Sequence, residues 1–282
     1  MTQNRFVSLR RLAPIAILGI ATALAIFLDS CGDSSSPVTP TAPRTARSIH
    51  TETGFPLDAD TSDDYHIKRD QYEISYNPGL NVANWVAWNE NASWYGPADR
   101  CDCFQPDTNL PKTFTLVTPG LYTSSGYDRS HILGSEARTR NADDNRFTFY
   151  MPNIFPQTPS MNQGTWASME RFADSLCNKA NKELYVVAGG VYKTRNRIKN
   201  VVTIPDSCWK IIVVLERGQT VGAITASTPV YAAMMNNGTY TTATNDWRLY
   251  KTTVRAIEQS TGYSLLRDVP QSVQDIIETR VW

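Results

Sequence analysis

The stretch Tyr127-Asp128-Arg129-Ser130-His131 places a histidine two residues after an arginine, just ahead of a predicted helix. Side chains two residues apart on an extended segment share a face, so Arg129 and His131 can address one ligand together. The chain has three histidines. His50 lies in a polar N-terminal stretch and His66 in the approach to the folded part, which leaves His131 for acid–base chemistry inside a core.

The polar residues Asn153, Asn162 and Glu170 follow within one supersecondary unit. The segment 162–181 has the clearest helical pattern of the chain, because its apolar residues recur at spacings of three and four: Trp166, Met169, Phe172, Ala173 and Leu176. Glu170 comes four residues after Trp166, at the edge of this stripe. A carboxylate at the edge of a buried helix face can point into a cleft.

Each of these residues also has an ordinary structural explanation. A single histidine near a strand end is commonly a hydrogen-bonded structural residue. Asn162 suits a helix cap and Glu170 a solvated helix face. Asn153, beside a proline, suits a turn. Spacing alone does not choose between the structural and the catalytic interpretation.

The overall charge excludes one class of binding protein. Lys and Arg balance Asp and Glu, 27 against 27, over 282 residues. A protein that binds polyanions through bulk charge would be basic. Any contact with a polyanion must therefore come from local clusters, such as the four cations between Lys193 and Lys199. The alternative for that run is a solvated loop.

Four of the five cysteines fall in the part of the chain expected to fold: Cys101, Cys103, Cys177 and Cys208. An even number in an exported protein favours disulfides, and four cysteines allow three pairings. Cys101-Asp102-Cys103 resembles half of a zinc site. No second Cys/His pair at zinc spacing accompanies it, so we expect disulfides rather than zinc.

The N-terminal region predicts export and tethering. Residues 1–31 combine an Arg-containing start, an apolar run and Leu28-Asp29-Ser30-Cys31-Gly32, which resembles a bacterial lipoprotein box with Cys31 as the lipidated residue. A cleaved signal peptide and an uncleaved anchor are the alternatives. Residues 32–67 are rich in Ser, Pro and Thr and predict a disordered tether, in which His50 is solvated.

Residues 68–282 predict one domain of strands and helices with no internal repeat. Alternating or continuous apolar runs predict strands over 72–76, 82–88, 146–150, 184–188, 209–215, 221–226 and 230–235. Helices are expected over 132–140, 162–181 and 246–261, and after Pro270. Asp246 is the expected cap of the third helix and Gly262 its stop.

Three motifs together resemble the DNA/RNA non-specific endonuclease family, the ββα-metal nucleases that include endonuclease G. They are Asp128-Arg129-Ser130-His131, Met151-Pro152-Asn153-Ile154-Phe155-Pro156-Gln157 and Asn162-Gln163-Gly164-Thr165-Trp166-Ala167-Ser168-Met169-Glu170. The resemblance extends over nearly all of 68–282. It implies an α+β fold, with a central, mostly antiparallel sheet flanked by helices and a ββα-metal active-site unit.

The resemblance also implies roles for single residues. His131 is similar to the general base, Arg129 to the phosphate-stabilising arginine, and Asn153 to the asparagine that orients active-site groups. Asn162 resembles the single protein ligand of a hydrated Mg²⁺, for which Mn²⁺ is a possible substitute. Glu170 resembles the carboxylate that hydrogen-bonds the waters of the metal.

Further cations are expected to contact the substrate. The expected contacts are Arg100, Arg138, Lys193, Arg195 and Arg197. Ser130 replaces a glycine of the signature, and it would be strained if its backbone needed a positive φ.

The chain therefore predicts an exported, membrane-tethered, Mg²⁺-dependent endonuclease that acts on DNA and RNA with little sequence preference. The alternatives are a catalytically weakened nucleic-acid-binding protein on the same scaffold and a nuclease toxin with a partner inhibitor.

Overall fold

The computed structural model of the chain describes residues 48–282. The expected lipoprotein-type signal over 1–31, with Cys31, lies outside the described residues, as does the first part of the expected tether. Within 48–282 no helix is both long enough and apolar enough to cross a membrane.

The folded domain begins well before Lys68. His50 is 2% exposed, and its Nδ1 accepts a hydrogen bond of 3.0 Å from the backbone amide of Asn89. Its Nε2 lies 2.7 Å from the carbonyl oxygen of Asp70 and therefore carries the proton that it donates there. The predictions of a disordered tether and a solvated His50 were wrong for residues 48–67. This segment is held by hydrogen bonds, which hydrophobic periodicity does not reveal.

A seven-stranded sheet forms the centre of the domain, and every strand pair within it is antiparallel. The strand order is β1-β2-β3-β6-β9-β10-β11. The bounds are β1 Tyr65–Lys68, β2 Glu73–Asn77, β3 Val82–Glu90, β6 Lys182–Val191, β9 Ser207–Glu216, β10 Val230–Asn236 and β11 Lys251–Thr252.

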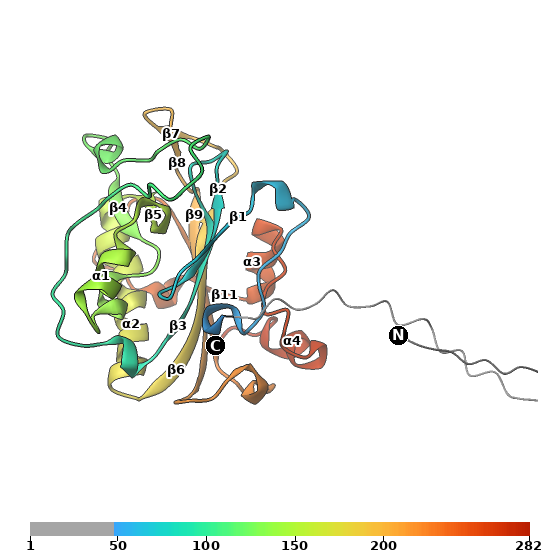
Figure 1. The fold of residues 1–282 in the computed structure, drawn as a ribbon. Coiled ribbons are helices and arrows are strands. Elements are labelled where there is room, and N and C mark those ends of the chain that lie inside the picture. Colours follow the sequence, from blue (N-terminus) through green and yellow to red (C-terminus); the bar gives the residue numbers. More distant parts are fainter. Residues whose placement is uncertain (1–47) are drawn as a thin grey trace, which may run out of the picture. The chain divides into compact units, whose positions relative to one another are not determined.

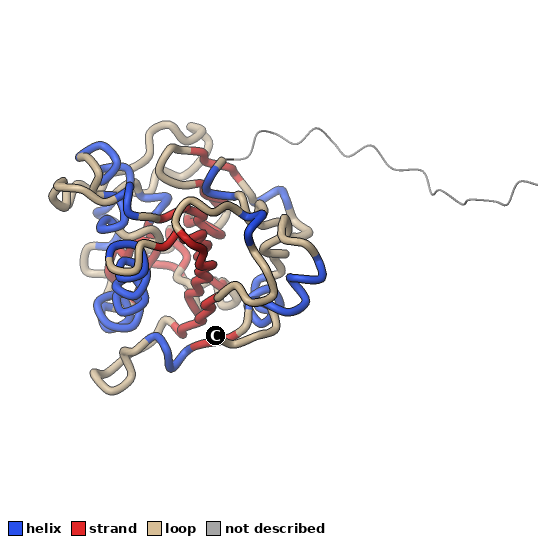
Figure 2. The backbone as a smooth tube through the Cα atoms, turned by 90° about the horizontal axis from the view of Figure 1, so that it is seen from below, coloured by secondary structure: helices blue, strands red, loops and turns tan. Residues whose placement is uncertain are grey.

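The central strands are buried on both faces, which explains their continuous apolar runs. One hydrophobic cluster lies under α2 (Ala167–Asn178) and the other under α3 (Val254–Thr261) and α4 (Gln271–Ile277). Figure 1 shows these helices on opposite sides of the sheet, and Figure 2 shows the sheet between the two layers. The predicted α+β fold, with its antiparallel sheet and flanking helices, is confirmed.

A second sheet, of two strands, carries the Asp128-Arg129-Ser130-His131 motif. β4 (Asp128–His131) pairs antiparallel with β5 (Ile154–Gln157), and His131 lies opposite Ile154. A π-helical segment, Met161–Trp166, then leads directly into α2. The predicted helix is thus present, but its first turns are π-helical, a form that often occurs at functional sites.

Two predicted strands are absent from the described structure. Residues 146–148 form the end of α1 (Ala142–Thr148). Asn141 caps the first turn of this helix, and its side chain accepts a hydrogen bond of 2.8 Å from the Asp144 amide. Residues 221–223 form a 3-10 turn. Neither run is long enough for its pattern to separate a strand from a helical turn.

The predicted helix over 246–261 is divided into three elements. Asp246 caps a 3-10 turn, Trp247–Tyr250, which is followed by β11 and then by α3. α3 has its own cap, since the Thr253 side chain accepts from the Ala256 amide at 3.1 Å. Gly262 ends α3 with φ +86°, as predicted. The 132–140 segment is only a 3-10 turn, Ser135–Arg138.

Candidate active site

A pocket of about 290 Å³ opens beside the end of β4 and the start of α2. Five residues predicted from the sequence line it: Arg100, Arg129, His131, Asn162 and Glu170. They come from a long loop, from β4, from the π-helical segment and from α2. The fold therefore brings together residues that are up to 70 positions apart in the chain.

His131 occupies the last position of β4 and is 7% exposed. Its ring packs edge-on against Phe149, with centroids 4.6 Å apart. Burial, followed by the positive charges of Arg100 and Arg129, lowers the pKa of His131 to about 3. The imidazole is therefore neutral near pH 7 and can accept a proton without first losing one.

Two arginines flank this histidine, and each guanidinium lies over an aromatic ring. Arg129 lies 4.4 Å from the ring centre of Phe104, and Arg100 lies 5.0 Å from that of Phe149. Both arginines also line a second pocket of about 340 Å³. A guanidinium fork matches the oxygens of a phosphate, so this pair can bind a phosphodiester next to His131.

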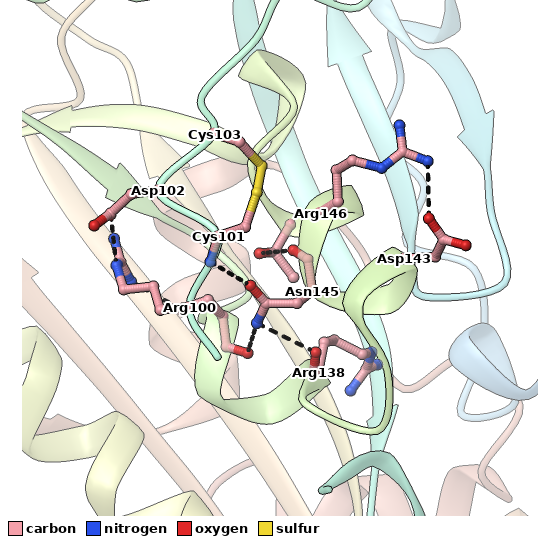
Figure 3. The surroundings of a disulfide bond; sticks show 10 residues. Arg100, Cys101, Asp102, Cys103, Arg138, Asp143, Asn145 and Arg146 are labelled. Carbon is pink, nitrogen blue, oxygen red and sulfur yellow. Dashed lines mark hydrogen bonds and ion pairs between the residues drawn. A yellow bond between two sulfur atoms is a disulfide. The ribbon is translucent and has the colours of Figure 1, made fainter. Parts of the chain in front are cut away.

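The loop that carries Arg100 contains a disulfide between Cys101 and Cys103 (Figure 3). Asp102, between the two cysteines, adopts φ +48° and accepts a 2.8 Å hydrogen bond from Arg100 Nε. Arg100 Nη1 donates to Ser135 Oγ at 2.8 Å. The guanidinium is thus held from two sides.

The expectation of disulfides is confirmed for Cys101 and Cys103 only. Cys177 and Cys208 are buried free thiols. Burial raises the pKa of both, that of Cys208 to about 12. They therefore behave as small core residues rather than as reactive groups.

Asn162 presents a fixed amide to the pocket. Its Nδ2 donates to Asp128 Oδ2 at 2.9 Å, and its Oδ1 accepts from Ser130 Oγ at 2.8 Å. Ser130 is fully buried inside β4 and has no positive φ. The strain considered for this serine does not arise, because an extended backbone suits any residue.

Glu170 faces the pocket one turn after the π-helical segment. A Cβ on Gly134 would lie 2.9 Å from Glu170 Oε1, so the chain passes very close to this carboxylate. Burial raises the pKa of Glu170, and the nearby charge of Lys210 opposes that shift. Lys210 Nζ lies 3.9 Å from Glu170 Oε1 and 4.0 Å from the ring centre of Trp166.

Lys210 is a site residue that was not predicted from the sequence. It is 2% exposed, lies on the central strand β9 and lines the pocket. One signal could have revealed it: a lysine inside the otherwise apolar run 209–215 needs a partner for its charge. Arg171, next to Glu170 and exposed, also lines the pocket and was not predicted.

Asn153 does not line the pocket, and its side chain holds the backbone that follows His131. Its Oδ1 accepts from the Leu133 amide at 3.0 Å, and its Nδ2 donates to the carbonyl oxygens of Leu133 and Thr148 at 2.9 and 2.8 Å. Its side chain is fully buried. Asn153 therefore contacts the protein backbone and acts through the position of His131.

Arg138 was predicted to bind substrate, and this prediction was wrong. The side chain is 0% exposed. It donates to the carbonyl oxygen of Gln71 at 2.7 and 3.1 Å and to that of Asn89 at 2.9 Å, and its guanidinium stacks 4.0 Å from the ring centre of Trp94. A fully buried guanidinium with these partners cannot reach a nucleic acid.

The predicted basic rim lies on a small hairpin of β7 (Arg197–Ile198) and β8 (Val202–Thr203). Lys193 and Arg195 are exposed on the loop that leads into it. Lys199 Nζ donates to the carbonyl oxygen of Gly120 at 2.9 Å, in a turn whose neighbouring residues line the second pocket. These cations line neither pocket, and their contact with substrate stays a prediction.

The sequence is similar to those of known nucleases. The sequence model of the DNA/RNA non-specific endonuclease family matches residues 50–272. The chain belongs to this family. A nuclease from Nostoc sp. (strain PCC 7120 / SAG 25.82 / UTEX 2576) is 42% identical over 270 residues, which is 94% of this chain and 97% of that protein.

More distant relatives fit the same assignment. A nuclease of Serratia marcescens is 27% identical and covers 78% of this chain and 81% of its own length. Mitochondrial endonuclease G of Homo sapiens is 25% identical over about half of each chain, 53% and 54%. A solved structure of an EndoG/EndoGI complex has the same fold, with a TM-score of 0.67 at 21% identity over 80% of this chain and 95% of that one.

The two buried histidines of this nuclease predict a loss of stability in acid. Burial lowers the pKa of His131 to about 3 and that of His50 to about 4, below the ordinary value of 6.5. Below pH 6.5 the unfolded chain binds protons that the folded chain excludes, so stability falls as the pH falls from 6.5 toward these values. We expect each histidine to cost about 2 kcal/mol at pH 5 relative to pH 7.

Urea unfolding of wild type and His50→Gln at pH 7 and pH 5 measures this contribution. The variant should lose about 2 kcal/mol less than wild type on acidification. An equal loss in both proteins would contradict the assignment of His50 as a buried neutral base.

Proposed function

We propose that this nuclease is a Mg²⁺-dependent endonuclease that hydrolyses phosphodiester bonds of both DNA and RNA with little sequence preference. One observation carries the proposal: a neutral imidazole, two arginines and an amide oxygen converge on one pocket. These are the groups that hydrolysis of a phosphodiester requires, namely a proton acceptor, counter-charges and a site for a hard cation.

The residues of the pocket fit a hydrated divalent cation. Asn162 and Glu170 offer oxygen atoms, which Mg²⁺ and Mn²⁺ prefer. The described residues contain no group of three or more His, Cys, Asp or Glu that could hold a metal. Mg²⁺ commonly keeps several waters and binds few protein oxygens, so Asn162 would ligate the ion directly and Glu170 would hold its waters.

When bound, the metal would offset the charge of the phosphate and supply a water that protonates the leaving oxygen. His131 accepts the proton of the attacking water, since its neutral imidazole lines the pocket together with both arginines. Arg129 and Arg100 hold the phosphate oxygens, and their separate supports, Phe104 and Ser135, fix their direction.

Low sequence preference follows from the kind of contact that the pocket offers. Arginine forks and a metal bind phosphate oxygens, which are the same at every step of DNA and RNA. The proposal is tested by incubating the protein with DNA and RNA of mixed sequence, single-stranded and double-stranded, in Mg²⁺ and in EDTA. Cleavage of every substrate with Mg²⁺ and of none with EDTA is expected. Retained cleavage in EDTA would overturn the metal requirement.

The basic loop is proposed to steer nucleic acid toward the pocket. Arg197 lies on the hairpin that contacts the turn at Gly120, beside the second pocket, and Lys193 and Arg195 lie on the loop that leads into it. Removing three positive charges near the path of a polyanion slows association, and the effect fades as salt screens the field. We expect the triple Gln variant to lower kcat/KM several-fold at low salt and little at high salt.

Measuring kcat/KM of wild type and of this triple variant between low and high ionic strength checks the steering role. A control removes one exposed cation outside this loop, Arg280→Gln, which lies after α4. Equal salt dependence for all three proteins would show that the loop has no steering function.

The N-terminal segment is proposed to export the nuclease and to attach it to a bacterial envelope through lipid on Cys31. The lipoprotein-like box and the Ser/Pro/Thr-rich stretch after it support this proposal. Labelling of the full chain and of Cys31→Ser with a radioactive fatty acid during export tests it. The wild type should incorporate the label and the variant should not. Equal incorporation would contradict lipidation at Cys31.

A further inference from the structure

We infer that Ser130 is a positioning residue for the metal site, because its hydroxyl holds the Asn162 amide in the orientation that ligation requires. The inference rests on the proposed function and deepens it. Ser130 replaces the glycine of the family signature, so the hydroxyl is a property of this chain rather than of the signature.

Asp128 fixes which way the Asn162 amide points. An ionised carboxylate only accepts hydrogen bonds, so the atom 2.9 Å from Asp128 Oδ2 must be the nitrogen Nδ2. The oxygen Oδ1 then lies on the Ser130 side, 2.8 Å from its Oγ. Asp128 also accepts from Gln163 Nε2 at 2.9 Å, which anchors the carboxylate itself.

Ser130 has one hydroxyl proton and two neighbouring amide oxygens. Its Oγ lies 2.7 Å from Gln157 Oε1 and 2.8 Å from Asn162 Oδ1. Among the described residues, the buried Gln157 Nε2 has no hydrogen-bond partner. Rotating the Gln157 amide by half a turn lets Nε2 donate to Ser130 Oγ.

In that arrangement Gln157 donates to Ser130, and the single proton of Ser130 goes to Asn162. Asn162 donates in turn to Asp128. Because the chain of bonds ends on a carboxylate, it runs in one direction only, and it leaves Asn162 Oδ1 with a lone pair free to face the pocket.

The consequence for metal binding is preorganisation. A surface asparagine must give up side-chain rotations when it ligates a cation, whereas Asn162 is already held at both ends of its amide. Hydrogen-bonding partners behind a metal ligand typically change metal affinity by about 10–100-fold. We expect loss of the Ser130 hydroxyl to raise the dissociation constant for Mn²⁺ about 10-fold.

The test measures Mn²⁺ binding to the full nuclease without substrate, by electron paramagnetic resonance of the free ion and by calorimetry. The variants are Ser130→Ala, Ser130→Gly and Asp128→Asn. Ser75→Ala is the matched control, since Ser75 is also fully buried in a strand and its Oγ also has an asparagine neighbour, Asn84 Nδ2, at 3.2 Å. The wild type and this control should bind alike, and the three site variants should bind about 10-fold more weakly.

The outcomes separate this inference from the proposed function. If wild type binds Mn²⁺, Asn162→Ala does not, and the Ser130 variants match wild type, then Ser130 has no positioning role and the metal site stands. If Asn162→Ala binds Mn²⁺ as wild type does, or wild type binds none, both are wrong. Ser130→Gly keeps the test decisive if the alanine variant does not fold, because glycine is the signature residue at this position.

Discussion

Replacing His131 with alanine should lower the rate of phosphodiester cleavage at saturating Mg²⁺ by about 10³-fold. In the proposed mechanism this histidine is the proton acceptor of the pocket, so its loss would leave the attacking water without a base. The arginines and Asn162 remain, so the affinity for nucleic acid and for Mn²⁺ should change little. Single-turnover cleavage of a labelled duplex measures the chemical step directly.

His66→Ala is the matched control for this prediction. His66 is a histidine at the edge of the sheet, with 40% of its side chain exposed, and it pairs with Glu73 rather than with the pocket. This variant should cleave at the wild-type rate. A loss of less than about 10-fold in His131→Ala would contradict the role of general base.

Replacing Arg138 with methionine should lower the free energy of unfolding by about 3 kcal/mol and leave the dissociation constant for nucleic acid unchanged. Methionine keeps much of the volume but donates nothing. The carbonyl oxygens of Gln71 and Asn89 then lose their guanidinium donor inside the protein, and the stack on Trp94 is lost.

Arg140→Met makes the same chemical change two residues away. Arg140 also lies over Trp94, at 4.6 Å, but 48% of its side chain is exposed. Its loss should cost less than that of Arg138, since the Arg140 guanidinium is half exposed and the buried partner Asp144 keeps hydrogen bonds from Gln71 and Asn141. Urea unfolding and a binding titration with a short duplex compare the two variants. Equal stabilities would contradict the structural role of Arg138, and weaker binding in Arg138→Met alone would restore it as a substrate contact.

The parts of the fold that were predicted from sequence are those with a strong hydrophobic pattern. The central strands β6 and β9 are continuous apolar runs because both of their faces are covered. The helix after Asn162 has a clear stripe, and Gly262 ends α3 as expected. These elements are stabilised by burial of apolar surface, and the spacing of apolar residues in the sequence shows which face of an element is buried.

The failures at His50, Arg138 and Lys210 share a physical cause, which is stabilisation by polar contacts between distant residues. The segment with His50 is held by the backbone of Asn89 and Asp70, which lie 39 and 20 positions away. Arg138 reaches Gln71 over 67 positions. A local pattern cannot show where such a donor finds its acceptor. Lys210 was missed for the same reason, because its partner Glu170 lies on another element.

The candidate site was predicted through the resemblance to a family rather than through spacing. Asn162 is a plausible helix cap in sequence, yet in the structure it sits inside a π-helical segment and turns its amide to Asp128 and Ser130. Ser130, which seemed a source of strain, adopts strand geometry and supplies a hydrogen bond to the proposed metal ligand. The departure from the signature is thus accommodated by the local structure.

The central claim is that a single pocket built around His131 cleaves both DNA and RNA. The most direct measurement is competition: the rate of cleavage of a labelled DNA duplex, with Mg²⁺, in the presence of increasing unlabelled RNA, for wild type and His131→Ala. We predict that RNA inhibits DNA cleavage with an inhibition constant equal to its own KM, and that the variant loses both activities in parallel. DNA cleavage that is insensitive to saturating RNA, or one activity that survives in His131→Ala, would contradict the claim.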